Sequence, residues 1–323
     1  MLTPILAVLA GLALLVWSAE RFVFGAAATA AALGVPTLLV GLVVVGFGTS
    51  APELLVSGTA ALTGNPALGV GNALGSNIAN IALVLGTTAL VTPLIVRSSI
   101  MRREFPVLLL VTVVAVVVSV IGEELSRLDG VILLIALLAA FAWLVRLSLR
   151  SPDPDPLSEE MEAEVPHDVP VTKALIWLVV GLLVLLGASR LLVWGAVSIA
   201  QTLGVSDLVI GLTIVAVGTS LPELAAGIAS ALKNEPDLVV GNVIGSNIFN
   251  TAGVMGLPAL LATLPLDHSV LTRDLPLVCI LTIALFLMSF GRRGEGRIGR
   301  VKGGILLLVF VAYQALLFQG TLA

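Results

Sequence analysis

The sequence has few charged side chains and almost none of the residues that soft metals prefer. Charged residues make up 11% of the 323 positions, and there are one cysteine and two histidines. The single cysteine, Cys279, excludes an intrachain disulfide. There is also no HExxH motif, no histidine within a long apolar run and no Ser/His pairing, so nothing indicates an enzyme. With 16 basic against 20 acidic residues, nothing indicates a nucleic-acid partner either.

Hydrophobic residues are abundant instead, at 58% of the chain, and the mean hydropathy is +1.14. This composition indicates an all-α polytopic membrane protein. Windows of about 20 apolar residues predict the spans. We expect ten transmembrane helices, at 3–28, 35–61, 67–92, 105–122, 129–148, 173–197, 206–231, 237–262, 275–290 and 303–320.

Acidic residues concentrate in one short segment, because seven of the twenty lie between Asp153 and Asp168. This segment is rich in proline and has no apolar period, so it is predicted to be a solvated linker. It divides the chain into a first five-helix repeat at 1–150, a linker at 151–172 and a second five-helix repeat at 173–323.

The two halves share a long motif. Residues 41–86 and 211–256 align without a gap at an offset of 170, and about half of the aligned positions are identical. Five spans in each half would make the second half enter the membrane from the opposite face. Such inverted-topology repeats are typical of secondary transporters, which bind their substrate near the midplane between the repeats.

Basic residues predict the orientation, since cytoplasmic loops carry the excess of Lys and Arg. With both termini outside, most of the loop Lys and Arg fall in cytoplasmic loops and the linker is cytoplasmic. Only Arg127 and Arg273 then remain in outer loops. We therefore expect a multi-pass protein of the cell inner (plasma) membrane, with its N- and C-termini outside.

Each repeat places oxygen-bearing side chains in otherwise apolar spans. Thr49 and Glu53 are four residues apart, as are Ser76 and Asn80, so each pair shares one helix face. The second repeat has the same pairs. An acid at membrane depth is costly and usually marks an ion or substrate pathway. Four such faces would form an oxygen cage suited to a hard cation such as Ca²⁺.

Proline and glycine predict the backbone around this cage. Pro52 and Pro222 cannot donate an N–H, so backbone carbonyls near them become free for an ion. The glycine pairs of the GNxxG segments, at 71 and 75 and at 241 and 245, indicate close helix packing. Four asparagines remain open between a structural hydrogen bond and a ligand role: Asn72, Asn242, Asn77 and Asn247.

The motifs GTSAPE, GTSLPE, GNALGSNIAN and GNVIGSNIFN resemble the alpha repeats of the cation/Ca²⁺ exchanger superfamily, specifically its prokaryotic Na⁺/Ca²⁺ exchanger-like branch. The resemblance covers essentially the whole chain and implies that the first helix of each half forms a sliding gate. The ion ligands that it implies are Thr49, Ser50, Glu53, Ser76, Asn80, Thr219, Ser220, Glu223, Ser246 and Asn250, with backbone carbonyls at Gly46 and Ala216.

One position departs from that family. Many Na⁺-coupled and K⁺-dependent members carry Asp where this chain has Asn250, and Asn80 is also an amide. The resemblance therefore implies an antiporter that exchanges Na⁺ for Ca²⁺, with a H⁺/Ca²⁺ antiporter using the same glutamates as the alternative. A passive cation channel is disfavoured by the repeats. No cofactor and no obligate protein partner is expected; the partners are the transported ions and the lipid bilayer.

Overall fold

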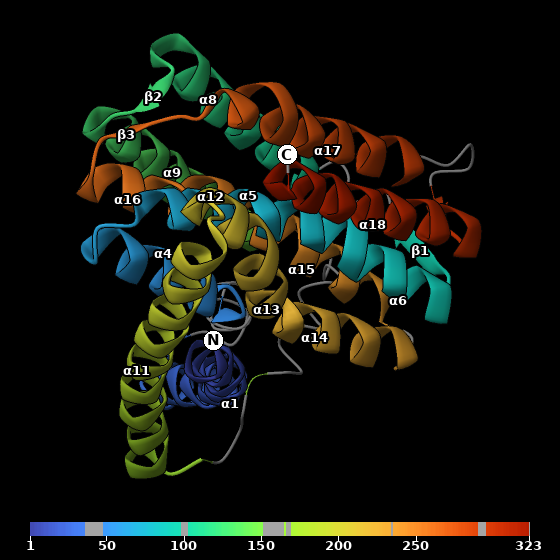
Figure 1. Ribbon diagram of the computed structural model, residues 1–323. Coiled ribbons are helices and arrows are strands. Elements are labelled where there is room, and N and C mark those ends of the chain that lie inside the picture. The colour runs from blue at the N-terminus through green and yellow to red at the C-terminus, as the bar shows by residue number, and fades with distance from the viewer. Residues whose placement is uncertain are drawn as a thin grey trace.

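The computed structural model describes residues 1–35, 48–97, 103–150, 165, 169–233, 235–289 and 295–322, and these residues are mostly helical (Figure 1). Within this part of the chain, nine helices are long and apolar enough to cross a membrane. The remaining predicted span, 35–61, runs through residues 36–47, which lie outside the described residues. Its described part contains α4 (Ala51–Leu62). The helical membrane class is confirmed, and the tenth span stays a prediction.

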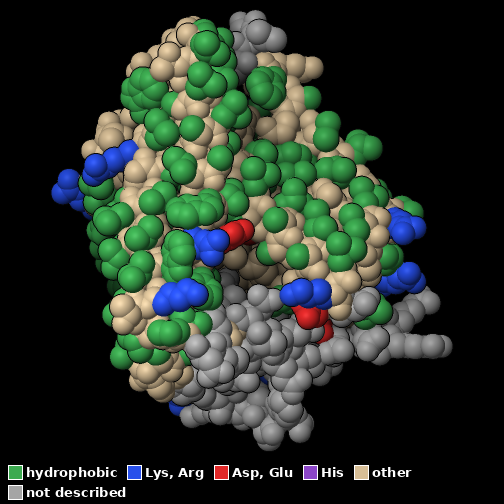
Figure 2. All heavy atoms as spheres, turned by 90° about the horizontal axis from the view of Figure 1, so that it is seen from below, with side chains coloured by type: hydrophobic (Ala, Val, Ile, Leu, Met, Phe, Trp, Pro, Cys, Tyr) green, Lys and Arg blue, Asp and Glu red, His purple; other side chains and the backbone are tan. Residues whose placement is uncertain are grey.

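Two long helices, α1 (Leu2–Ala32) and α11 (Val171–Leu203), pack against each other at one side of the molecule (Figure 1). A side chain at Gly25 or Gly181 would collide with the backbone of the opposite helix, so glycine allows this close approach. Both helices extend beyond the predicted ranges 3–28 and 173–197. Figure 2 shows many exposed hydrophobic side chains over the part of this side that is described, and α1 and α11 contribute exposed leucines such as Leu6, Leu9 and Leu183, as expected for a surface that faces lipid.

The shared motif forms the centre of the molecule. One central span consists of α5 (Pro66–Ile78), η2 (Ala79–Val84) and α6 (Leu85–Val91). Its counterpart consists of α15 (Pro236–Phe249), η4 (Asn250–Val254) and α16 (Gly256–Leu261). In the most apolar 18-residue stretch of these two spans, 78% and 83% of the residues are buried, against 28% in the corresponding stretches of 127–147 and 300–319. Such burial explains how they tolerate polar residues that a lipid-facing helix could not carry.

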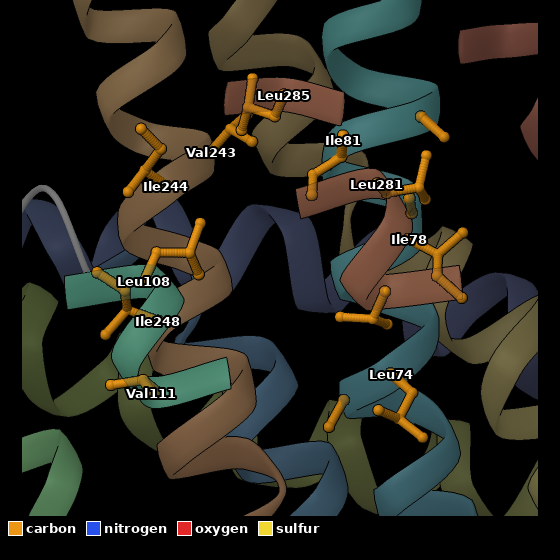
Figure 3. Close-up of a cluster of buried hydrophobic side chains, with 14 of the residues drawn as sticks. Leu74, Ile78, Ile81, Leu108, Val111, Val243, Ile244, Ile248, Leu281 and Leu285 are labelled. Carbon is orange, nitrogen blue, oxygen red and sulfur yellow. The ribbon is translucent and has the colours of Figure 1, made fainter. Parts of the chain in front are cut away.

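The outer helices cover these central spans on the side away from α1 and α11 (Figure 1). They are α8 (Phe105–Gly122), α9 (Arg127–Arg150), α17 (Leu275–Ser289) with the preceding η5 (Val270–Asp274), and α18 (Arg300–Leu322). Figure 3 shows Leu108 of α8 and Leu281 of α17 in one buried cluster with Ile78 and Ile244 of the central spans. This apolar packing holds the central helices in place.

Two short antiparallel sheets depart from the all-α prediction. β1 (Leu94–Arg97) pairs with β4 (Glu295–Ile298), and β2 (Glu124–Leu125) pairs with β3 (Leu264–Pro265). Their strands are connectors between helices, and pairing satisfies backbone groups that a helix would satisfy internally. Each sheet joins a connector of the first half to one of the second.

The predicted linker, 151–172, is described only at Val165 and from Val169 onward, so its other residues lie outside the described part of the chain. The helices on either side are α9, which ends at Arg150, and α11, which begins at Val171. The division of the chain into two repeats and a linker stays a prediction.

Candidate functional site

The two glutamates lie close to the start of a helix, and in the second repeat that helix restarts after a break. Ser50 precedes α4, and Ser220 separates α13 (Ala216–Thr219) from α14 (Leu221–Leu232). Proline follows two residues after each serine, in the first turn of the new helix, where its missing N–H does no harm. Glu53 and Glu223 consequently sit in the first turns of α4 and α14, at the end of the helix where the backbone dipole favours a carboxylate.

The GSN segments lie on the central spans, and both end in a wider helical turn. Ser76 lies in α5 and Asn80 in η2, while Ser246 lies in α15 and Asn250 opens η4. The sequence did not predict these π-helical turns. They alter the regular helical geometry at the last polar position of each motif, which is common at functional sites.

The close helix packing predicted at Gly71 and Gly75 is present in the structure. A side chain at Gly71 would collide with the Leu208 carbonyl of α12 (Asp207–Ile210), and one at Gly75 would collide with Ala216. Central helix α5 therefore packs closely against α12, η3 (Gly211–Val215) and α13, the run that leads to Ser220. The first-half glycine pair thus has the structural role predicted for it.

Nearly all of the predicted ligands are buried. Thr49 is half-buried, and the other nine side chains of the set are at most 1% exposed. Gly46 lies outside the described residues, whereas Ala216 is fully buried. Nine of the ten proposed ligand side chains are therefore shielded from bulk solvent in this conformation.

Contacts between the halves bring these residues together. Thr219 donates from Oγ1 to Asn72 Oδ1 at 3.1 Å, and its Oγ1 lies 3.4 Å from Ser76 Oγ. Thr49 donates from Oγ1 to Asn242 Oδ1 at 3.4 Å. The carboxyl groups of Glu53 and Glu223 are near enough to interact through their charges. Both repeats thus contribute to one cluster.

The asparagines left open by the sequence form hydrogen bonds between the halves. Asn77 Nδ2 donates to Thr251 Oγ1 at 2.8 Å, and Asn80 Nδ2 donates to Asn247 Oδ1 at 3.1 Å. In contrast, both polar atoms of the Asn250 side chain are buried without a hydrogen-bond partner among the described residues. Equivalent asparagines in the two repeats therefore have different environments.

Several buried oxygens of the cluster receive no hydrogen bond of normal geometry from the described residues. They are both carboxyl oxygens of Glu53 and of Glu223, the hydroxyls of Ser50, Ser220 and Ser246, and the amide oxygens of Asn80 and Asn250. Buried polar atoms are normally paired, because burying them unpaired is costly. A hard cation would satisfy these oxygens, and two carboxylates would balance one divalent charge.

Other metal chemistry finds no support in the described residues. They contain no group of three or more His, Cys, Asp or Glu side chains placed to hold a metal ion. A cation held by the glutamate pair would need neutral hydroxyl, amide and carbonyl oxygens to complete its coordination shell. Such a mixed oxygen set suits reversible binding of a transported ion better than tight binding of zinc or copper.

Sequence reasoning missed two polar residues next to this cluster. Ser57 Oγ accepts a hydrogen bond from Asn72 Nδ2 at 3.0 Å, and Thr251 Oγ1 accepts the one from Asn77. Their counterparts at the 170-residue offset are Gly227 and Ile81, so neither belongs to the repeated pattern. A comparison of positions where the repeats differ, rather than agree, would have identified them.

The sequence of the chain matches a protein family and several known proteins. The family described as "Sodium/calcium exchanger protein" matches residues 3–146 and 173–319. The putative antiporter CaxA of Alkalimonas amylolytica is 47% identical over 99% of this chain and 100% of its own length. The inner membrane protein YrbG of Escherichia coli (strain K12) is 42% identical, over 95% and 94%.

The fold is also similar to a solved structure. The sodium-calcium exchanger NCX_Mj, soaked with Na⁺ and Sr²⁺, matches with a TM-score of 0.66 and 34% identity, over 97% of this chain and 98% of its own. The family match includes both halves and every described residue of the oxygen cluster. On this evidence, the chain belongs to the sodium/calcium exchanger family.

Proposed function

We propose that this protein is a secondary active antiporter that exchanges Na⁺ for Ca²⁺ across the membrane by alternating access, and that it extrudes Ca²⁺. The observation that carries the proposal is the pair Glu53 and Glu223. The two acids come from the two repeats and are fully buried, and no hydrogen bond of normal geometry from a described residue reaches their carboxyl oxygens, although the hydroxyls of Thr219 and Thr49 lie near them. Family membership supports the choice of ions.

The mechanism follows from the charge of the cluster. One divalent ion would neutralise both glutamates, and so would two monovalent ions. Ca²⁺ and Na⁺ would therefore compete for the same oxygens. The proposed ligands are the twelve positions predicted above. An empty cluster leaves two carboxylates facing each other in a buried place, which disfavours movement without an ion. Exchange rather than leak is the expected result.

The alternating movement is proposed for α1 and α11. These helices contact each other over much of their length, and their buried apolar cluster, which includes Leu15 and Leu192, also contains Val56 of α4 and Leu68 of α5. The contact between α1 and α11 is more extensive than the contact of either helix with the rest of the molecule, so the pair is suited to move over its apolar contact with the central region as one body. The proposed arrangement has ten spans, with the halves related by inverted topology.

A proton-coupled version of the same antiporter is the second candidate. The observation that favours it is the amide at both Asn80 and Asn250, which leaves only the two glutamates to carry charge in the cluster. Burial disfavours the charged form of a carboxylate, so protons would compete with Ca²⁺ for these groups. Glu53 and Glu223 would then be the titrating residues.

The deciding experiment is ⁴⁵Ca²⁺ uptake into proteoliposomes. Vesicles loaded with Na⁺ are compared with vesicles that hold choline and carry an imposed pH gradient. Uptake that requires internal Na⁺ is the expected result. Uptake only with the pH gradient would establish the proton-coupled antiporter instead, and uptake that needs no ion on the opposite side would indicate a channel. Uptake in neither case would overturn both antiport proposals.

A further inference from the structure

A buried hydrogen-bond chain fixes the side chain of Asn72 in the first repeat. Asn72 Nδ2 donates to Ser57 Oγ at 3.0 Å and to the backbone oxygen of Glu53 at 3.3 Å. Ser57 Oγ in turn donates to the Gly69 carbonyl at 3.1 Å. Both side chains are fully buried. Because Asn72 Nδ2 is held by these two acceptors, Asn72 Oδ1 points away from them and toward Thr219.

The fixed amide oxygen orients a proposed ligand of the other repeat. Thr219 has one hydroxyl hydrogen, and Asn72 Oδ1, at 3.1 Å, is closer to its Oγ1 than the Ala216 carbonyl at 3.3 Å or Ser76 Oγ at 3.4 Å. The Glu53 carboxylate also lies near this hydroxyl. When the hydrogen goes to Asn72, the Ala216 carbonyl keeps its lone pairs and the Thr219 oxygen acts as an acceptor. Cations bind through lone pairs, so both oxygens become available together.

The second repeat cannot build the same chain. Gly227 occupies the position equivalent to Ser57 and has no hydroxyl to accept a hydrogen bond from Asn242. The equivalent bond, from Thr49 to Asn242 Oδ1, is longer at 3.4 Å. A Cβ at Gly227 would lie 3.2 Å from Thr88 Oγ1, so the space for a serine there is tight. The anchor therefore exists in one half only, although both Thr–Asn pairs are conserved between the repeats.

We propose that Ser57 is a positioning residue for ion binding. By holding the Asn72 amide, Ser57 directs the hydroxyl hydrogen of Thr219 to Asn72 Oδ1. The lone pairs of Thr219 Oγ1 and of the Ala216 carbonyl oxygen then remain available for a cation. This inference rests on the proposed function, since it assigns a divalent cation to the same oxygen cluster. It makes the cluster asymmetric: the side formed by Thr219 is ordered before the ion arrives, whereas the side formed by Thr49 is ordered less firmly.

The test is equilibrium ⁴⁵Ca²⁺ binding to the purified full-length protein in detergent. Ser57→Ala is expected to raise the Kd for Ca²⁺ about 3- to 10-fold, as for the loss of one ordering hydrogen bond. In a protein that already carries Asn72→Ala, Ser57→Ala is expected to cause no further change in Kd, because the hydrogen bond from Thr219 to Asn72 is already absent. Ser57→Gly, which copies the second repeat, is expected to match Ser57→Ala.

The matched control is Ser18→Ala. Ser18 is equally buried, but the hydrogen bond that its hydroxyl makes among the described residues stays within its own helix, to the Leu15 carbonyl at 3.2 Å. The Ser18→Ala protein should therefore have the wild-type Kd for Ca²⁺. A purely structural role would lower the thermal midpoint of the ion-free protein without this dependence on Asn72.

Three results would overturn the inference: an unchanged Kd in both Ser57 variants, additive effects of Ser57→Ala and Asn72→Ala, or a wild-type protein that does not bind Ca²⁺. The proposed function fails separately, if the wild type binds Ca²⁺ but shows no Na⁺-driven uptake in proteoliposomes. Binding and exchange thus test the two proposals with different measurements.

Discussion

At the scale of single residues, the molecule depends on a few polar side chains in buried positions. Glu53 and Glu223 were identified from the sequence because a buried acid is costly and here recurs at the same place in both halves. Asn80 and Asn250 also match in sequence, yet only Asn80 makes a hydrogen bond among the described residues. Identity of residue type thus did not predict identity of environment.

Removing the charge of either glutamate should abolish exchange. Glu53→Gln and Glu223→Gln keep the side-chain volume but leave one carboxylate to balance a divalent ion. We expect ⁴⁵Ca²⁺ uptake to fall at least about 100-fold, because charged ligands dominate the affinity of hard-cation sites. Glu124→Gln, at an exposed acid, is the control and should retain wild-type uptake. Near-normal uptake by either glutamate variant would contradict the assignment.

The two asparagines should respond differently to aspartate. Asn80→Asp would replace the amide that donates to Asn247 Oδ1 with an acceptor, so two oxygens would face each other. We expect this change to lower the stability of the ion-free protein by about 1–3 kcal/mol. Asn250→Asp breaks no such bond and should cost less. Thermal unfolding of both variants in detergent measures the difference in stability. Equal midpoints would contradict the prediction that Asn80→Asp costs more than Asn250→Asp.

At the scale of helices, glycine decides how closely the central spans approach their neighbours. The spacing of Gly71 and Gly75 predicted close packing, and both positions meet the run that begins with α12. The sequence could not say which helix would be the neighbour, because a glycine pair indicates a close contact without naming its partner. Only the folded arrangement shows that first-repeat glycines contact the second repeat.

Filling that contact should destabilise the protein. Gly71→Ala would place a methyl group against the Leu208 carbonyl, so we expect a loss of about 1–3 kcal/mol, as for other overpacked cores. Gly187→Ala is the matched control, since nothing lies within 4 Å of a Cβ at that helical position. It should leave the thermal midpoint equal or higher, because alanine favours the helix. A Gly71→Ala protein as stable as the control would contradict this packing argument.

At the scale of the whole molecule, contacts between the halves define the structure. The oxygen cluster combines both repeats, and each short sheet pairs a first-half connector with a second-half connector. Neither half could form the cluster alone. The proposed inverted topology places the two copies of the motif on opposite sides of one site, as alternating access requires.

The orientation can be tested with introduced cysteines. Cys279→Ser removes the single native thiol, after which Ser158→Cys reports on the linker and Gln319→Cys on the C-terminal helix. In intact cells, a membrane-impermeant maleimide should label position 319 and spare position 158, because the basic residues favour a cytoplasmic linker. Labelling of position 158 without permeabilisation would show that the linker is outside and would contradict the predicted orientation. Uptake by the Cys279→Ser protein confirms that the background is functional.

The sequence by itself determined the membrane class, most of the helix ranges, the repeat and the identity of the buried acids. These follow from local composition and from a recurrence at fixed spacing, which need no knowledge of distant contacts. Only the tertiary structure decided which oxygens find a hydrogen-bond donor, that Ser57 anchors Asn72, and that short strands join the halves. Those features depend on which residues of one repeat meet which residues of the other, and apolar spans pack by shape with little in their sequence to specify a partner.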